Sequence, residues 1–351
     1  MWQRANSYIR SIFSSSKLRD VIVRYLLMIL LVFVFFGLIL LIYGKDPIKS
    51  YGDILGSTFG STYGFSEVIV AMIPMLITAL AVALPWRAGL INIGGEGQIY
   101  IGAAFATWGA LTFTNLPAWI LLPLMMLLGM LGGALWAFIP GYLKAIGLVN
   151  ETIVTLLLNS VGILVVGFLI FSFWHSVTDT NMTVIFVPAA LLPTFFGTRI
   201  HLGLVIGLVL LALYWFVMRY TRWGLEMRAI GGNSQAARRN GIPLKGYLII
   251  VMCIGGAIAG LAGMAMVSGF YHRLLTNVSQ SVGFMGFLIS WLAGAEPIGI
   301  LLMSFVVAII LTGGTLLQLT IALPYAVINI LLAFTLFVVL SRQVFFERKK
   351  A

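Results

Sequence analysis

Long apolar runs follow one another along most of the chain, separated by short breaks that contain charged residues, glycine or proline. Most runs approach or reach the roughly 20 residues that an α-helix needs to cross the hydrocarbon layer of a membrane. We therefore expect an all-α polytopic membrane protein with about ten transmembrane helices. The predicted spans are 21–43, 66–86, 89–111, 118–143, 151–173, 202–218, 246–268, 282–294, 298–317 and 324–341.

Composition agrees with this pattern, because 61% of the 351 residues are hydrophobic and only 9% are charged. The net charge of +11 does not indicate nucleic-acid binding, since the Lys and Arg residues lie between the apolar runs and form no basic stripe with interleaved aromatics. The single cysteine, Cys253, lies inside an apolar run, so we expect neither a disulfide framework nor a thiolate metal site.

The positions of Lys and Arg predict the orientation, because cytoplasmic loops of membrane proteins are enriched in these residues. An even number of spans places both ends of the chain on one side. That side receives most of the basic residues, and the opposite side keeps Lys45, Lys49, Arg199 and Arg273. We therefore expect both termini in the cytoplasm.

Three segments follow from this layout. Residues 1–20 form either a helix on the inner leaflet, with Trp2 and Phe13 near one face, or a cytoplasmic basic tail. Residues 21–341 form the transmembrane domain, which includes a cytoplasmic loop at 219–245. Residues 342–351 form a basic cytoplasmic tail.

The third predicted span contains the unusual stretch "GLINIGGEGQIYIGA", residues 89–103. Irregular or glycine-rich backbone at membrane depth persists only where protein or a water-filled cavity surrounds it. Asn92, Glu96 and Gln98 are therefore expected to point toward other helices or toward a hydrated path. In the alternative interpretation, the glycines allow close helix packing and Glu96 is a structural cap or ion-pair partner.

The eighth span, "GFMGFLISWLAGAEPIG", is also short and rich in glycine, and it ends at Glu296 and Pro297. Because it comes five spans after the third, spans two to five and seven to ten could be inverted copies with one broken helix each. Such a pair of broken helices is a sequence indicator of a transport path at the interface of two repeats.

The loop at 219–245 contains a short helix with both of its ends marked in the sequence. Asn233 or Ser234 is the predicted N-cap, 235–240 the helical turns, and Gly241 the residue just past the end, with Pro243 beyond it. This helix is either a docking site for a soluble partner or part of an ordinary basic loop.

Four stretches in this order resemble one family: "AGLINIGGEGQIYIGA", "VNETIVTLLLNSVG", "MRAIGGNSQAARRNGI" and "GFMGFLISWLAGAEPIG". They are similar to the permease subunits of bacterial ABC importers for simple sugars and nucleosides, and the first is most similar to the nucleoside type. The resemblance covers about residues 20 to 341. It implies a protein of the bacterial cytoplasmic membrane, without a cofactor of its own. It also implies a second permease subunit, identical or different, cytosolic ATPases that bind ATP-Mg, and an extracytoplasmic binding protein or lipoprotein.

The resemblance also implies roles for individual residues. The helix from Ser234 to Asn240 would dock on the ATPase, and the residues implied in this coupling are Arg228, Ala229, Asn233, Ser234, Ala236, Ala237, Arg238, Gly241 and Ile242. The residues expected along or beside the translocation path are Asn92, Glu96, Gln98 and Asn159. Asn150 and Glu151 open the fifth span, where an N-cap role is favoured over a gating role. Many relatives have glycine and a basic or amide residue where this chain has Ala295 and Glu296, which leaves the role of Glu296 open.

Other functional classes fit less well. The stretch Gly44-Lys45-Asp46 lacks the Ser or Thr and the upstream glycine of a phosphate-binding loop, so this chain has no ATPase motif there. An ion-coupled transporter would depend mainly on Glu96. The three histidines, His175, His201 and His272, suggest no catalytic pairing by their spacing.

The cargo is expected to be a small neutral solute, because no span is lined by a cluster of basic side chains. Nucleosides are the first expectation and simple sugars the second. Phe284, Phe287 and Trp291 lie near one face of the eighth span and could stack on a base, although such a stripe more often serves helix packing.

Overall fold

The computed structural model describes residues 30–31, 33–177 and 179–321, together with residues 324, 326, 327, 330, 331, 333, 334, 337 and 338. The predictions for 1–20 and 342–351, and most of that for 324–341, lie outside the described residues. The chain divides into two compact units. One consists of Met1–Ser57 with Gly313–Ala351, and the other of Thr58–Thr312.

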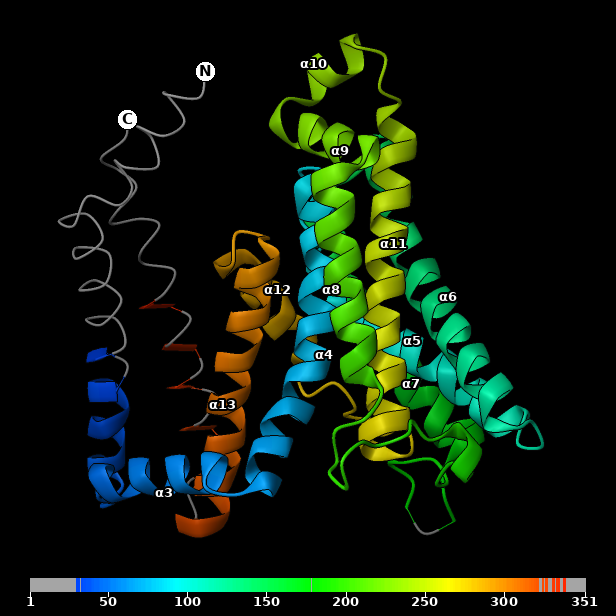
Figure 1. Ribbon diagram of the computed structural model, residues 1–351. Helices are drawn as coiled ribbons and strands as arrows, with labels where there is room; N and C mark the ends of the chain where they lie inside the picture. The colour runs from blue at the N-terminus through cyan, green and yellow to red at the C-terminus, as the bar shows by residue number, and fades with distance from the viewer. Residues whose placement is uncertain are drawn as a thin grey trace, which may run out of the picture. The chain divides into compact units, whose positions relative to one another are not determined.

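The larger unit is helical. Its helices are α4 (Thr62–Arg87), α5 (Gly95–Thr112), α6 (Ala118–Ala145), α7 (Glu151–Leu169), α8 (Gly203–Tyr220), α9 (Arg222–Gly232), α10 (Ser234–Arg239), α11 (Leu244–Ala265) and α12 (Val282–Leu292) (Figure 1). Two π-helical turns, η1 (Ile170–Trp174) and η3 (Met266–Tyr271), extend α7 and α11, and η2 (Pro188–Ala190) is a 3-10 turn. α3 (Pro47–Phe59) and α13 (Pro297–Ile321) cross the boundary between the units.

Six helices among the described residues are long and apolar enough to cross a membrane: Thr62–Arg87, Ala118–Ala145, Glu151–Trp174, Gly203–Tyr220, Leu244–Tyr271 and Pro297–Ile321. Each coincides with a span that the sequence predicts. α12 is shorter, at 11 residues, as its glycine and proline pattern predicts. The helical fold with several apolar helices long enough to span a membrane is thus confirmed, while the total of ten spans, the inverted halves, the broken helices of spans three and eight and the cytoplasmic position of both ends stay predictions.

α4, α5 and α11 form the core of the larger unit. In the most apolar 18-residue stretch of α4, 83% of the residues are buried. The corresponding share is 67% for α11 with its extension η3, and 28% for α6 and for α7 with η1. α4 contacts α8, α11 and α12, and α11 contacts α5 and α6. Figure 1 shows α4, α8 and α11 side by side, with α10 beyond one end of α8 and α11.

Glycine brings α6 and α11 into backbone contact. A Cβ on Gly133 would lie 2.1 Å from the carbonyl oxygen of Gly256, and one on Gly260 would lie 2.0 Å from that of Gly129. These distances are shorter than any side chain tolerates, so these four glycines are packing sites between α6 and α11.

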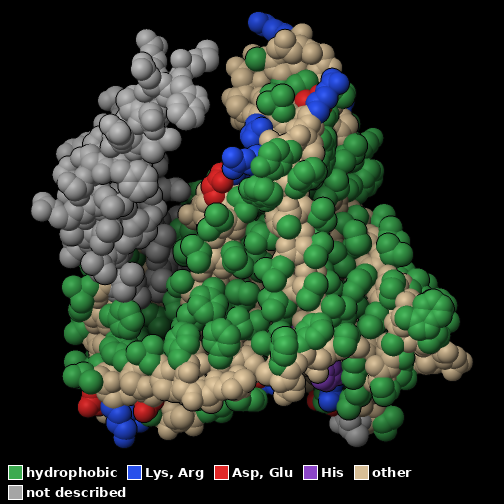
Figure 2. Space-filling view, viewed as in Figure 1, with side chains coloured by type: hydrophobic (Ala, Val, Ile, Leu, Met, Phe, Trp, Pro, Cys, Tyr) green, Lys and Arg blue, Asp and Glu red, His purple; other side chains and the backbone are tan. Residues whose placement is uncertain are grey.

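The outer face of the larger unit is apolar. Leu164 and Phe168 of α7 are 72% and 61% exposed. Figure 2 shows hydrophobic side chains over the middle of the helices and Lys and Arg side chains near α9 and α10. Such a surface suits a hydrocarbon environment with charge at the membrane boundary.

In the smaller unit, a short apolar helix, Phe33–Ile42, contacts α3. The ring of Tyr51 meets that of Phe33 edge to face at 5.1 Å, and its hydroxyl donates to the Phe33 carbonyl.

Candidate functional site

The third predicted span is helical only from Gly95 onward in the structure. Instead of starting near residue 89, helix α5 begins at Gly95, and the preceding stretch 91–93 has no regular structure. Two buried amide side chains, one before α5 and one in its first turn, hydrogen-bond each other across this stretch. Asn92 Nδ2 donates to Gln98 Oε1 at 3.1 Å, and Gln98 Nε2 donates to Asn92 Oδ1 at 3.0 Å. The backbone N–H of Gly94 also donates to Asn92 Oδ1, so the side chain replaces a helical hydrogen bond that the irregular backbone lacks.

Asn159 of α7 anchors the same stretch from the other side. Its Oδ1 accepts from the backbone N–H of Gly97 at 2.8 Å, and its Nδ2 donates to the carbonyl of Ile93 at 2.9 Å. Asn92, Gln98 and Asn159 are each at most 2% exposed. Three residues that the sequence singled out therefore form one buried network that holds the start of α5 against α7.

Glu96, in the first turn of α5, contacts the start of helix α12. Its carboxylate accepts hydrogen bonds from Ser279 Oγ at 2.9 Å, from the N–H of Ser281 at 3.2 Å and from the N–H of Gly283 at 2.8 Å. The first N–H groups of a helix lack partners within the helix and attract negative charge. Ser281, the N-cap residue, makes no side-chain cap, so Glu96 of α5 caps α12 in its place.

This geometry is the capping contact that the alternative interpretation of Glu96 describes, and a place for Glu96 along the translocation path stays a prediction. The residue is 3% exposed. A Cβ on Gly283 would lie 2.2 Å from the N atom of Glu96, so glycine is required at this crossing of α5 and α12. Ser279 was missed by sequence reasoning, because its partner is 183 residues away and no local pattern marks it.

Helix α12 has two different faces. Gly283, Gly286, Ile289 and Ser290 are buried, and a Cβ on Gly286 would lie 2.6 Å from the side chain of Thr78 in α4. Phe284, Phe287 and Trp291 are only partly buried. The ring of Trp291 lies 6.1 Å from those of Phe287 and Trp86. The aromatic stripe predicted from the sequence is thus less buried than the glycine face, and Trp291 also meets Trp86 of α4.

The start of α7 has the predicted cap. Asn150 Oδ1 accepts from the N–H of Thr152 at 2.9 Å. Glu151, whose side chain is 7% exposed, forms an ion pair with Lys144 at the end of α6, with 2.7 Å between Nζ and Oε2. Lys144 and Glu151 therefore fasten the short connection between α6 and α7.

The loop helix is present with the predicted caps. α10 spans Ser234–Arg239, Asn233 Oδ1 accepts from the N–H of Ala236 at 3.0 Å, and Gly241 has a φ of +84°. The predicted coupling residues are exposed, except that Ala237 is buried and Ile242 is partly buried. Ala237 is buried where α10 packs on α9 and the start of α11, so its methyl group is not exposed to a partner.

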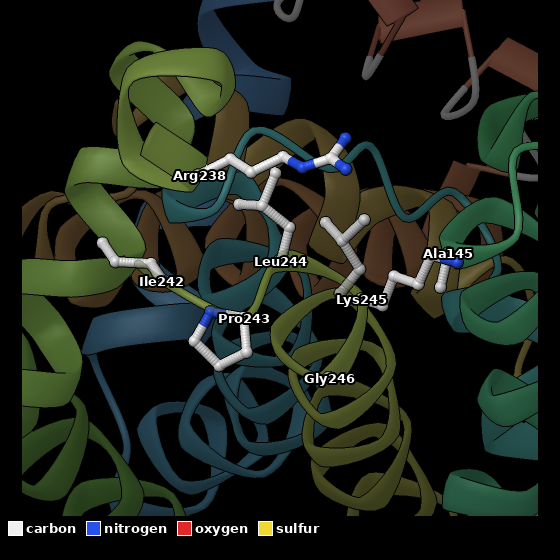
Figure 3. A pocket seen from close by; sticks show the side chains of 8 residues that line it. Ala145, Arg238, Ile242, Pro243, Leu244, Lys245 and Gly246 are labelled. Carbon is white, nitrogen blue, oxygen red and sulfur yellow. The ribbon is translucent and has the colours of Figure 1, made fainter. Parts of the chain in front are cut away.

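A pocket of about 440 Å³ adjoins α10 (Figure 3). Arg238 and Ile242 line it from α10 and the following turn, Leu244 and Lys245 from the first turn of α11, and Ala145 from the end of α6. The exposed part of this loop thus combines two cations with apolar side chains.

A third cluster lies at the end of α4. The guanidinium of Arg87 donates to Glu296 Oε1 at 2.6 Å, to the carbonyl of Ala295 at 2.8 Å and to the hydroxyl of Tyr214 at 3.2 Å. Tyr214 in turn donates to the carbonyl of Ala295 at 2.8 Å. The residue that the sequence left open, Glu296, therefore pairs with Arg87.

The described part of the chain contains no candidate metal site, because nowhere in it do three His, Cys, Asp or Glu residues lie close enough together to bind an ion.

Comparison with known proteins identifies the family. Residues 64–340 match the family described as the permease component of the branched-chain amino acid transport system. The chain is 32% identical over 324 residues to the glucose ABC transporter permease protein TsgB13 of Haloferax volcanii, covering 89% of this chain and 85% of the relative. It is also 32% identical over 310 residues to the nucleoside ABC transporter permease protein NupB of Lactococcus lactis, covering 85% of each.

A further relative is the guanosine ABC transporter permease protein NupP of Bacillus subtilis, 31% identical over 311 residues, which covers 87% of this chain and 89% of the relative. Among solved structures, PsaBC from Streptococcus pneumoniae in complex with Fab has a TM-score of 0.52 at 12% identity, covering 86% of this chain and 100% of that chain. This last match supports the fold alone. The chain belongs to the family of ABC transporter permeases.

Proposed function

We propose that this permease moves nucleosides into a bacterial cell, across the cytoplasmic membrane, with energy from ATP hydrolysis on a separate subunit. The cargo assignment is carried by the similarity to permeases named for nucleosides and guanosine, at 32% and 31% identity. The partly buried aromatic side chains of α12 support it, since aromatic rings stack well on the flat faces of bases.

The transporter that we propose contains further subunits. A second permease, identical or different, completes the path, and cytosolic ATPases bind ATP-Mg, so this chain needs no cofactor of its own. An extracytoplasmic binding protein or lipoprotein delivers the cargo. Residues 1–20, the loop at 219–245 and the tail at 342–351 face the cytoplasm in this proposal, in agreement with the bias of Lys and Arg.

Helix α10 is the proposed docking element for the ATPase. Both of its ends are capped, so it is a small rigid body, and its exposed side chains include Ser234, Ala236 and Arg238. Arg228 and Ala229 precede it, and Gly241 and Ile242 follow it. Ala237 contributes from the inside by fixing α10 to the loop.

The proposed path runs beside the crossing of α5 and α12. Phe284, Phe287 and Trp291 contact the cargo from α12. Asn92, Glu96, Gln98 and Asn159 brace the wall of the path, because their polar atoms are already engaged by the protein.

Simple sugars are the second candidate cargo, favoured by the similarity to a glucose permease at 32% identity. An ion-coupled mechanism has less support. Its main candidate, Glu96, has its carboxylate occupied by three donors from the start of α12.

The test is uptake of radiolabelled adenosine and labelled glucose by vesicles that contain the complete transporter. We expect ATP-dependent accumulation of adenosine that unlabelled nucleosides compete for, that excess glucose leaves unchanged, and that persists with an uncoupler. Accumulation of glucose instead would reassign the cargo, and collapse with the uncoupler would reject the ATP-driven mechanism.

A further inference from the structure

Arg87 joins three parts of the larger unit at the end of α4. Its side chain reaches the turn between α12 and α13 through the carbonyl of Ala295 and the carboxylate of Glu296, and it reaches α8 through Tyr214. Tyr214 is 6% exposed. The Arg87 side chain is 22% exposed, so it is largely shielded from solvent.

The turn that Arg87 contacts has an unfavourable backbone. Gly294 and Ala295 are both in the left-handed region, with φ of +60° and +55°. For a residue with a Cβ, such as Ala295, this conformation costs about 1–2 kcal/mol. It persists where surrounding contacts impose it, and the Ala295 carbonyl receives hydrogen bonds from both Arg87 and Tyr214.

The ion pair alone would not hold this turn. The Glu296 side chain is 67% exposed, and an exposed pair contributes about 0–1 kcal/mol. The turn is fixed mainly by the planar guanidinium of Arg87, whose N–H groups donate to a carboxylate, a carbonyl and a hydroxyl at the same time. A Lys ammonium lacks this fixed fork.

The backbone of Arg87 touches the loop that carries α10. A Cβ on Gly231, in the last turn of α9, would lie 2.5 Å from the carbonyl oxygen of Arg87, and one on Gly89 would lie 3.2 Å from the Cα of Gly231. Asn233, two residues after Gly231, is the N-cap of α10. Any displacement of α9 toward α4 therefore meets Arg87 directly.

We propose that Arg87 is a positioning residue that keeps the end of α12 closed against α4 and α8, and that releases it when α9 and α10 move. The link to α10 rests on the proposed docking of the ATPase there. The part of the proposal that concerns α12 depends only on the hydrogen bonds of Arg87. Glu296, which departs from the pattern of the resembling family, has in this proposal the role of securing the guanidinium.

Ser290 provides a reporter for this closure. It lies one turn after Gly286 on the buried face of α12, is 0% exposed, and its hydroxyl has no hydrogen-bond partner among the described residues. Ser304 of α13 is also 0% exposed with an unpartnered hydroxyl, so it is a matched control. Both can be replaced by cysteine in a Cys253→Ser background.

The experiment measures how fast a membrane-impermeant maleimide, added on the side of α10, labels the full-length permease with Ser290→Cys. We expect Arg87→Ala to raise the labelling rate at least about 10-fold and Arg87→Lys to raise it less. Ser304→Cys should stay protected in every background. A merely structural defect would expose both cysteines alike.

Unchanged labelling of Ser290→Cys in Arg87→Ala would overturn the proposal, and so would equal labelling of Ser304→Cys. If Arg87→Ala does not fold, the exposed change Glu296→Gln takes its place, with an expected increase of about 3-fold and the same criterion. This measurement needs neither ATPase nor cargo. Faster labelling in Arg87→Ala together with no effect of ATP on the complete transporter would uphold the closure and reject the proposed docking.

Discussion

The carboxylate of Glu96 accepts a hydrogen bond from the backbone N–H of Gly283 at 2.8 Å, although the two residues are 187 positions apart. A side chain from the first turn of α5 thereby caps the start of α12. In the interior of a membrane protein, this contact satisfies a charged group and the free donors of a helix end together.

Removing this cap should destabilise the crossing of α5 and α12. Glu96→Leu leaves Ser279, Ser281 and Gly283 with unsatisfied donors, each of which costs about 1–3 kcal/mol. We expect a clear fall in the thermal unfolding midpoint in detergent and loss of uptake. Glu96→Gln keeps an acceptor oxygen and should lose less. A Glu96→Leu protein as stable as the parent would show that the capping contact contributes nothing.

The contact between α6 and α11 should tolerate no side chain at its centre. Gly133→Ala places a methyl 2.1 Å from the Gly256 carbonyl oxygen, so the helices must separate, at a cost of about 1–3 kcal/mol. Gly167→Ala in α7 is the matched control, because nothing lies within 4 Å of its Cβ position. Unfolding of both variants in mild detergent measures the difference, and equal stability would refute the close approach of α6 and α11.

Acid should destabilise the protein through His201, which precedes α8. Burial lowers the pKa of His201 to about 4 from the ordinary 6.5, with smaller effects from His272 and Arg199. Its Nδ1 accepts from the N–H of Gly203 at 3.2 Å, so the folded state holds the neutral ring.

The difference in the His201 pKa between the folded and unfolded states sets how stability changes with pH. Below pH 6.5 the His201 side chain is protonated in the unfolded chain, whereas in the folded chain it stays neutral until about pH 4. Stability is therefore complete above pH 6.5 and falls as the pH drops toward 4. Between pH 7 and pH 5 we expect a loss of about 2 kcal/mol. Thermal unfolding in detergent measures it, and the loss should disappear in His201→Gln. The same pH dependence in that variant would assign it to another group.

The aromatic face of α12 should affect cargo affinity more than folding. We expect Phe287→Ala and Trp291→Ala to raise the KM for nucleoside uptake by about 5- to 100-fold each, the equivalent of about 1–3 kcal/mol for a lost stacking contact. Phe168→Ala, at an exposed position of α7, is the control and should leave the KM unchanged. A lower maximal rate with the KM of the parent would point to a packing role for the stripe.

Features with local causes could be predicted from the sequence. Apolar run length placed the six long helices, and capping residues placed α10 between Asn233 and Gly241. The favoured N-cap role of Asn150 is confirmed by its bond to Thr152. Each of these signals is complete within a few neighbouring residues.

The contacts of the site could not be predicted, because they join residues far apart in the chain. The sequence indicated that Glu96 and Asn159 need polar surroundings, but nothing local shows that one meets Gly283 and the other Gly97. The same holds for Arg87 and Glu296, 209 positions apart. α5 begins later than its apolar run predicts, because side chains of Asn92 and Asn159 satisfy the backbone before it.

The coupling of α10 to an ATPase can be measured as ATP hydrolysis by the complete transporter in lipid nanodiscs, with and without cargo-loaded binding protein. Ala236→Asp changes an exposed position of α10 and should leave the fold intact. We expect strong stimulation of hydrolysis by loaded binding protein in the parent and none in Ala236→Asp, with both proteins equally stable. Full stimulation in Ala236→Asp would contradict the claim that α10 links this permease to its ATPase.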